Sequence, residues 1–528
     1  MSLGPNFVSP FGGLADTGVD RSLLERALLD ILPTSVGPER AATPVTLWIA
    51  RSATLASGGR ELVIPPHVIL SFAPGAVLTL AAGVTIDVQG RLDAGTERRF
   101  ALGADARVRF SGPLDEIHAS WWDDGRSGGA PVQHALDVLW DRYARGREPA
   151  PVCLSGPYQL DAPVRVVPPL ELAAPDAPPY AVVLRGRCHG ASAPMTFRAN
   201  SSATVDTLDA LLSVEGKVIL TLDHVGFDLT QLPEGFFSAD VDALRLGGEY
   251  DRSRIEACTF RHGGKTGIHV TALWDAWREA FGDTARTGAG IGVAIGALLT
   301  ATAMMTSVSR KAARLTISRC NFEGAAVTGL GIRINPMAPT MLSVSDCQFG
   351  GIFYNAITFT GSELSVFGCA FHNRAIPTGK HAEYIADIRL GVHGTLPSVL
   401  PGLPGVNAHL TVTHCRSTSE TFLVGQPVFT AGDPGGALLT GVLHEPRTTA
   451  SEDVATSIRW GVGYQARSLM LQGCEFWAPV RLGGRATAGV VVELGTRFEN
   501  LSGRPAYVGG DAGSVLRLPP PPTSPVMP

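Results

Sequence analysis

The sequence is constrained most by a short apolar pattern that recurs through its second half. The clearest copy is Leu315-x-Ile317-x-x-Cys320-x-Phe322, in which apolar and polar residues alternate and one extra residue precedes the cysteine. Alternation with period two predicts a strand in each copy, and the extra residue predicts a bend before the cysteine. Related copies, one with valine in place of cysteine, lie at residues 220–227, 255–260, 342–349, 364–371, 410–415 and 469–476.

The spacing of the copies predicts a solenoid. Successive cysteines of the pattern lie 62, 27, 22, 46 and 59 residues apart. We expect the steps of 22 and 27 to be single coils and the step of 46 to be two coils. We expect the longer steps to contain an insertion or a coil without cysteine. Parallel strands about 4.8 Å apart would place equal side chains above one another in the interior. The cysteines concerned are Cys258, Cys320, Cys347, Cys369, Cys415 and Cys474.

The repeat resembles the single-stranded right-handed parallel β-helix of the pectate-lyase-like superfamily, which includes polygalacturonases and phage tailspikes. Residues 62–95, short apolar runs broken by Pro and Gly, resemble the opening coils of these proteins. The loop 121–125 and the helical pattern at 132–140 resemble the loop and helix that follow those coils, although a second acidic pair is absent. The resemblance implies an all-β solenoid but no single function, because this fold carries lyases, hydrolases, binding proteins and inert spacers.

The chain is expected to divide into five segments. A helical spacing at 20–32, preceded by Asp20 as N-cap and ended by Pro33, predicts an N-terminal helix that either caps the first coil or docks the protein onto a larger particle. A second helical pattern lies in the insertion 269–310, and a turn is expected at 184–190. The segments are 1–45 (cap or docking), 46–120 (first coils), 121–150 (loop and helix), 151–515 (main β-helix with the insertion) and 516–528 (Pro-rich tail).

Composition excludes several classes of function. The net charge of −5 gives no reason to expect nucleic acid as a partner. The uncharged run 287–309 is long enough to cross a bilayer, but its Gly and Thr content favours a buried coil or an interface, so no membrane span is expected. The cysteines are predicted to be free, buried thiols. Because no Cys-x-x-Cys occurs, we expect no metal and no cofactor.

The N-terminal residues MSLGPNFVSPFGG lack the basic and apolar regions of a secretory signal. We therefore expect synthesis in the cytoplasm, with two routes left open afterwards. The protein is either carried on a particle or exported by a route other than Sec.

The outward face of the repeat is where chemistry is expected, since residues between the inward ones point to solvent. Its middle is a ladder of Ser and Thr. At its upstream end Asp223 and Glu256 occupy the same outward position, about one strand spacing apart if their coils are adjacent. Paired carboxylates at such distances serve as acid and base in glycosidases, and Arg254 would bind a sugar carboxylate or balance the pair. The alternative is a solvated surface pair.

Aromatic side chains that stack on sugar rings are the second candidate feature. Each of them is also a candidate cap or core residue. The predicted substrate-binding residues are Trp121, Trp122, Trp274, Trp277 and Phe367.

Two functions remain open on this evidence. The first is a polysaccharide-directed β-helix that binds a glycan and, if it is an enzyme, cleaves it as a lyase or glycoside hydrolase. The second is a non-catalytic structural or adhesive component of a phage-like or other large particle, favoured because the Asn-x-Asp, Asp-Asp and Gly-His-Gly set of polygalacturonases is not found in order. By resemblance to tailspikes, a homotrimer is expected.

Overall fold

The structure is a computed structural model of the chain. It describes residues 7–8, 44–55, 61–125, 128–174, 177–186, 195–204, 207–232, 241–248, 250–262, 266–270, 313–324, 330–334, 340–351, 355–359, 363–372, 385–390, 409–425, 436–446, 455–460, 468–482, 491–499, 501, 503–509 and 515–518.

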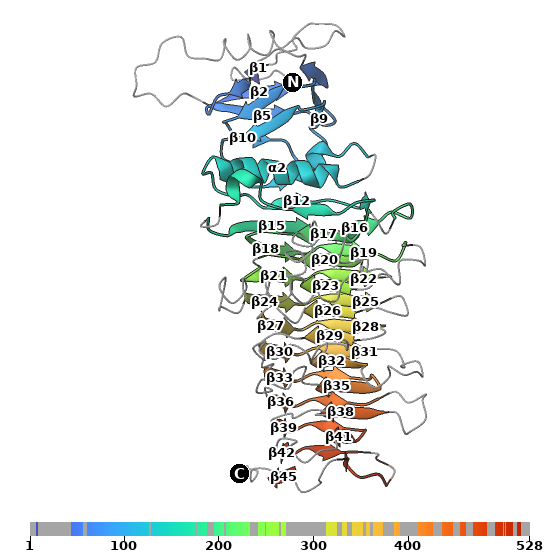
Figure 1. Cartoon of the computed structure of the whole chain (residues 1–528). Helices are drawn as coiled ribbons and strands as arrows, with labels where there is room; N and C mark the ends of the chain where they lie inside the picture. The colour runs from blue at the N-terminus through green and yellow to red at the C-terminus, as the bar shows by residue number, and fades with distance from the viewer. Residues whose placement is uncertain are drawn as a thin grey trace, which may run out of the picture.

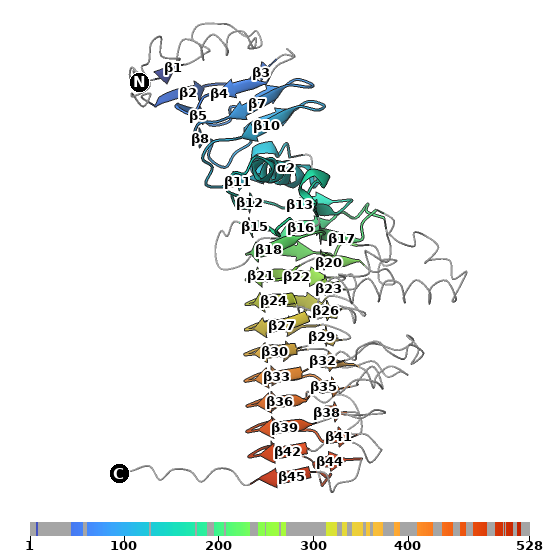
Figure 2. The same ribbon diagram turned by 60° about the vertical axis from the view of Figure 1, so that its left-hand side comes forward.

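The main body is a parallel β-helix built from three long parallel sheets (Figure 1), which confirms the fold expected from the repeat. Strands of one sheet come from successive coils, so every coil contributes to each sheet in turn. Figure 2 shows the strands of the longest sheet, here called sheet A, in one straight stack. Its 13 strands are β11 (Ile117–His118), β12 (Val152–Leu154), β15 (Tyr180–Gly186), β18 (Val218–Asp223), β21 (Ser253–Glu256), β24 (Ala313–Ser318), β27 (Thr340–Ser345), β30 (Glu363–Phe367), β33 (His409–Thr413), β36 (Ala437–Thr440), β39 (Leu469–Gln472), β42 (Val491–Leu494) and β45 (Val515–Leu518).

The other two sheets have 11 strands each. Sheet B contains β13 (Tyr158–Leu160), β16 (Met195–Ala199), β19 (Gly226–Asp228), β22 (Thr259–His262), β25 (Asn321–Gly324), β28 (Gln348–Gly350), β31 (Ala370–His372), β34 (Arg416–Ser417), β37 (Leu443–His444), β40 (Glu475–Phe476) and β43 (Arg497–Phe498). Sheet C contains β14 (Val164–Val166), β17 (Ala210–Val214), β20 (Asp242–Leu246), β23 (Thr266–Val270), β26 (Leu330–Ile334), β29 (Asn355–Phe359), β32 (Ala386–Leu390), β35 (Thr421–Gly425), β38 (Thr456–Trp460), β41 (Val480–Leu482) and β44 (Tyr507–Val508).

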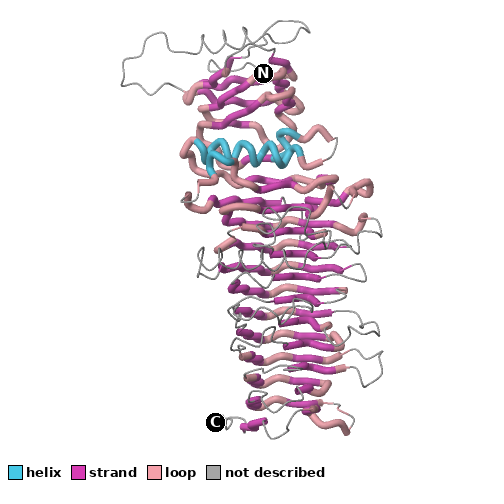
Figure 3. Tube along the Cα trace, in the orientation of Figure 1, coloured by secondary structure: helices cyan, strands magenta, loops and turns pink. Residues whose placement is uncertain are grey.

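A smaller set of coils precedes the main body, and a helix lies between the two (Figure 3). The helix, α2 (Ala130–Ala144), confirms the helical pattern read at 132–140. It buries Val132, Leu136 and Leu139 completely. The 3-10 helices are η1 (Ala119–Trp122) and η2 (Leu170–Leu172). The N-terminal strands are β1 (Phe7–Val8), β2 (Val45–Ile49), β5 (Val68–Phe72) and β8 (Leu92–Asp93) in one sheet; β3 (Ala53–Leu55), β6 (Leu78–Leu80) and β9 (Phe100–Leu102) in the second; β4 (Leu62–Ile64), β7 (Thr85–Val88) and β10 (Arg107–Phe110) in the third.

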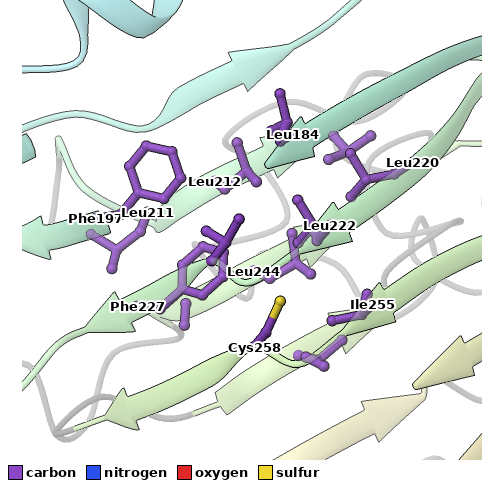
Figure 4. Close-up of a cluster of buried hydrophobic side chains, with 14 of the residues drawn as sticks. Leu184, Phe197, Leu211, Leu212, Leu220, Leu222, Phe227, Leu244, Ile255 and Cys258 are labelled. Carbon is purple, nitrogen blue, oxygen red and sulfur yellow. The ribbon is translucent and has the colours of Figure 1, made fainter. Parts of the chain in front are cut away.

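The core is formed by inward-pointing side chains of all three sheets (Figure 4). The register of the strands places residues of the same type above one another on successive coils, as the repeat predicts. Five phenylalanines of sheet B form a continuous stack, with ring centroids 4.7–5.0 Å apart and nearly parallel planes. The centroid spacing matches the strand spacing of a parallel sheet, so the stack follows directly from the register. Its members are Phe227, Phe260, Phe322, Phe349 and Phe371.

The bend between sheets A and B is made by a single residue in the left-handed conformation, which confirms the extra residue of the pattern. Arg319 has φ 53°, Asp346 has φ 54° and Gly368 has φ 62°. The next residue is the cysteine, whose thiol donates to a carbonyl of the coil before it. Sγ of Cys320 lies 3.6 Å from the carbonyl oxygen of Ile255. All six cysteines of the pattern are buried and free.

Four expectations from the sequence are corrected or lie outside the described residues. The step of 46 residues was expected to be two coils, but β30 pairs directly with β33, so it is one coil with an insertion. The turn expected at 184–190 is wrong at its start, because residues 184–186 belong to β15. The helix at 20–32 lies outside the described residues, as does the insertion 269–310 apart from its first two residues in β23.

Candidate functional site

The outward face of sheet A carries two straight columns of side chains. Residues of one column are register partners on successive strands. Alternation along each strand sends one residue to the core and the next to solvent, so strand β27 has Ser343 exposed between buried Leu342 and Val344. The first column contains Arg185, Asp223, Glu256, Ser318, Ser345, Phe367, Thr413 and Thr440. The second column lies beside the first and contains Thr221, Arg254, Thr316, Ser343, Ser365 and Thr411.

The predicted carboxylate pair lies at the upstream end of this face. Asp223 at the end of β18 is the register partner of Glu256 at the end of β21, so the two coils are adjacent. The side chain of Asp223 is 26% exposed and that of Glu256 is 39% exposed. Arg254 is exposed and in register with Thr221 and Thr316, in the neighbouring column.

Each carboxylate contacts basic side chains other than the predicted Arg254. Nε of Arg185 lies 3.2 Å from Oδ2 of Asp223, and Nδ1 of His224 lies 2.6 Å from Oδ1 of the same carboxylate. Glu256 pairs with Arg319, the bend residue of the next coil. Among the described residues Arg185, His224 and Arg319, and not Arg254, contact the two carboxylates. Arg185 was missed because its segment was read as a turn.

Downstream of the charged residues the two columns carry mainly hydroxyl side chains. Thr316, Ser343 and Thr411 are exposed, and Ser365 is half-buried. Phe367 interrupts the other column of hydroxyls and is 50% exposed. The ring of His414 meets it edge-on, with centroids 6.0 Å apart. An exposed aromatic ring among hydroxyls is a combination suited to sugar, whose faces are apolar and whose edges are hydroxyls.

Two of the aromatic residues predicted to stack on a substrate do not lie on the surface. Trp121 is 3% exposed and Trp122 is 6% exposed, because both belong to η1 and pack against Phe110 and Phe100 of the first coils. They are core residues, so the prediction of sugar contact is wrong for both. Trp274 and Trp277 lie outside the described residues.

Sheet C carries a buried polar cluster that the sequence did not indicate. Oδ2 of Asp242 accepts from Nε of Arg245 at 3.0 Å and lies 2.9 Å from Nδ1 of His269. Arg245 also pairs with Asp209 at 2.5 Å. Burial by itself would raise the pKa of Asp242, but His269 and Arg245 together hold that pKa below its ordinary value. The cluster joins β20 to β23 and to residue 209, which precedes β17.

A second buried polar group interrupts the phenylalanine column of sheet B. Ser417 and His444 stand at the next two register positions after Phe371. Oγ of Ser417 donates to Asp387 at 2.5 Å, and Nε2 of His444 donates to the carbonyl oxygen of Ser419 at 2.7 Å. Nδ1 of His444 lies 2.8 Å from Oγ of Ser457. Desolvation lowers the pKa of His444 to about 4, so the ring is neutral near pH 7.

One group among the described residues brings three metal-ligand types together. Glu116, His118 and Cys153 place one ligand atom each within 4.8 Å of the others. His118 and Cys153 lie on the first two strands of sheet A, and Asp223 lies two strands after Cys153.

Fold and register define the chain as a parallel β-helix protein. No protein-family model matches it, and no curated protein matches it. Among solved structures it is similar to the full-length tailspike protein 2 from Escherichia coli O157:H7 bacteriophage CAB120, with a TM-score of 0.34 and 8% sequence identity. The match covers 72% of this chain and 43% of the tailspike chain, so this chain spans less than half of that protein. None of the helices described is long and apolar enough to cross a membrane.

Proposed function

We propose that the protein binds polysaccharide along the outward face of sheet A. The observation that carries the proposal is the exposed ring of Phe367 set within columns of hydroxyls. Neighbouring hydroxyls of a column repeat at the strand spacing of about 4.8 Å, which is close to the length of one pyranose unit. A glycan lying parallel to the solenoid axis would therefore meet an equivalent hydroxyl at each sugar, with Phe367 under one ring.

A row of charged side chains lies at the upstream end of this face. Arg185, Asp223, His224, Glu256 and Arg319 lie on four successive coils, and the two carboxylates in the middle are flanked by the two arginines. Paired charges of both signs can bind hydroxyls through charge-assisted hydrogen bonds without requiring a charged sugar. We therefore expect the face to bind neutral glycans and glycans that carry a carboxylate on some of their sugars.

The binding part is tested by affinity electrophoresis against a panel of bacterial capsular and plant polysaccharides. At least one polysaccharide is expected to retard the protein. Phe367→Ala should weaken that interaction by about 3- to 10-fold, the loss of one aromatic contact. Val63→Ala, which removes a 40% exposed apolar side chain on the first coils, is the matched control and should have no effect. Retardation by none of the polysaccharides, or equal retardation of the Phe367 variant, contradicts the proposal.

Cleavage is the finer part of the proposal and assigns Asp223 and Glu256 as the catalytic pair, with Arg254 beside them. The assay reads reducing ends and the absorbance of unsaturated products after incubation with a retained polysaccharide. If products form, Asp223→Asn and Glu256→Gln should each abolish them while retention in the gel persists. Retention without products assigns the face to binding alone, and products that survive both substitutions place the chemistry elsewhere.

A further inference from the structure

We propose that Glu116, His118 and Cys153 form a zinc-binding site at the junction between the first coils and the main β-helix. The three side chains offer a carboxylate oxygen, an imidazole nitrogen and a sulfur, with all three ligand atoms within 4.8 Å of one another. This mixed set suits zinc, whereas calcium and magnesium prefer oxygen ligands alone. Three protein ligands and one open position are the usual arrangement of an accessible zinc site.

Cys153 differs from the six cysteines of the repeat in the direction it faces. Its register partners are His118 and Arg185, both in the outward column of sheet A. The repeat cysteines instead stand at the bend and donate to carbonyls of the preceding coil. Cys153 therefore lies outside the interior column of cysteines and is the register partner of a histidine. Packing of the core does not explain a cysteine at this position. Cys153 is nevertheless only 3% exposed, so the site is shielded from bulk water on the sulfur side.

The distance between the Glu116 and His118 ligand atoms fits tetrahedral coordination. Oε2 of Glu116 lies 3.3 Å from Nε2 of His118. Bonds of 2.0–2.2 Å from zinc to nitrogen and oxygen at a tetrahedral angle separate the two ligand atoms by about 3.3 to 3.5 Å. A zinc-bound sulfur lies about 3.6 Å from each of these atoms. Sγ of Cys153 lies within 4.8 Å of both, so each of its two distances has to fall by about 1.2 Å at most.

Neighbouring residues orient two of the three ligands, Glu116 and His118. Nη1 of Arg185 lies 3.8 Å from the other carboxylate oxygen of Glu116, which leaves Oε2 to face the histidine. The ring of His118 lies 5.2 Å from the ring of buried Trp121, which restricts its rotation. Residues that orient ligands in this way commonly change metal affinity by about 10- to 100-fold. The 40% exposure of the Glu116 side chain leaves one side of the site open to water or to an external ligand.

The position of the site indicates what zinc would do there. His118 ends β11 and Cys153 lies in β12, and the segment between them carries η1 and α2. Zinc would therefore link the first two strands of sheet A, which lie at the two ends of the helical segment between them. Binding to the folded protein alone stabilises it by mass action, so the transition temperature should rise with zinc concentration.

The test uses the full chain, stripped with chelator and titrated with zinc sulfate by calorimetry. One zinc per chain is expected, with the affinity falling at least about 10-fold in His118→Ala and in Cys153→Ser. His414→Ala, an exposed histidine on the same sheet, should bind as the unmodified protein does. Cobalt(II) serves as a second probe: it should give a sulfur-to-metal charge-transfer band that Cys153→Ser removes. Circular dichroism of the metal-free variants confirms that they fold.

Absence of binding by the unmodified chain overturns the proposal. Zinc binding that is unchanged in both ligand variants overturns it as well, since the metal would then lie elsewhere. Binding of calcium with equal affinity would indicate that only the carboxylate of Glu116 binds the metal, and it would also contradict a zinc site. None of these outcomes bears on glycan binding, which the Phe367 variant tests separately.

Discussion

Asp223 and Glu256 are register partners on adjacent strands, yet each carboxylate forms an ion pair with an arginine of a neighbouring coil. Arg185 comes from the coil before, and Arg319 from the coil after. The pair is therefore the centre of a charged row that crosses at least four coils, from Arg185 to Arg319. Its residues are partly exposed, and exposed ion pairs contribute little to stability.

The first prediction is that Asp223→Asn and Glu256→Gln leave the stability of the fold nearly unchanged. Each should shift the free energy of unfolding by less than about 1 kcal/mol, because the pairs are solvent-exposed. Urea denaturation followed by circular dichroism measures this. A loss of several kcal/mol would show that the row supports the solenoid and would remove the reason to regard it as a ligand-binding surface.

The second prediction concerns two phenylalanines of opposite environment. Phe322 is fully buried in the stack between Phe260 and Phe349, whereas Phe367 is 50% exposed. Phe322→Ala should cost about 3–5 kcal/mol by loss of apolar contact and creation of a cavity. Phe367→Ala should change stability by no more than about 0.5 kcal/mol. The two denaturation midpoints, measured side by side, check both values; equal midpoints would contradict the assignment of the stack to the core.

The third prediction is a pH dependence that arises from His444. Its pKa in the fold is about 4, against an ordinary value of 6.5, so the unfolded chain binds more protons between these limits. Stability is therefore fully present above pH 6.5 and falls as the pH drops toward 4. The loss from this group is about 2 kcal/mol at pH 5.

His444→Gln tests that assignment, because glutamine does not titrate. The fall of the urea midpoint between pH 7.5 and pH 5 should be smaller in this variant. His414→Gln, which replaces an exposed histidine, is the control and should keep the full pH dependence. If both variants lose the same amount of stability as the unmodified protein, another group is responsible.

The fourth prediction is that the thiols of the repeat do not react in the folded protein. Burial raises the pKa of Cys474 to about 11, and the hydrogen bond with Cys347 is the main reason that the pKa of Cys369 rises to about 12. Since the thiolate is the reactive form, iodoacetamide at pH 8 should leave both unmodified until denaturant is added. Peptide mass spectrometry gives the extent of labelling. Labelling in the native state, or disulfide-linked peptides, would contradict the buried arrangement.

The solenoid could be predicted because the same residue types recur at the same positions of each repeat. Cys320, the bend residue Arg319 and Phe322 each have a fixed direction, and their recurrence defines the register. Coil number was harder to predict. β30 and β33 are paired in register although 46 residues separate their cysteines, so this spacing does not distinguish one long coil from two short ones.

The candidate site was predicted only in part, for physical reasons that differ from residue to residue. Asp223 and Glu256 could be placed because they lie on regular strands. Trp121 and Trp122 could not, because an aromatic residue beside a Gly-rich loop is equally consistent with exposure and with burial under the next element. Cys153 and His118 are 35 residues apart with a helix between them, so only the fold brings them together.

The central claim, that the outward face of sheet A binds a glycan, is tested most directly by the structure of the complex with an oligosaccharide released from a polysaccharide that the protein retains. We expect the sugar chain to lie parallel to the solenoid axis over Ser343, Ser365 and Thr411, with one ring against Phe367. An oligosaccharide bound over sheet B or sheet C, with the hydroxyl columns of sheet A left in contact with solvent alone, would contradict the account.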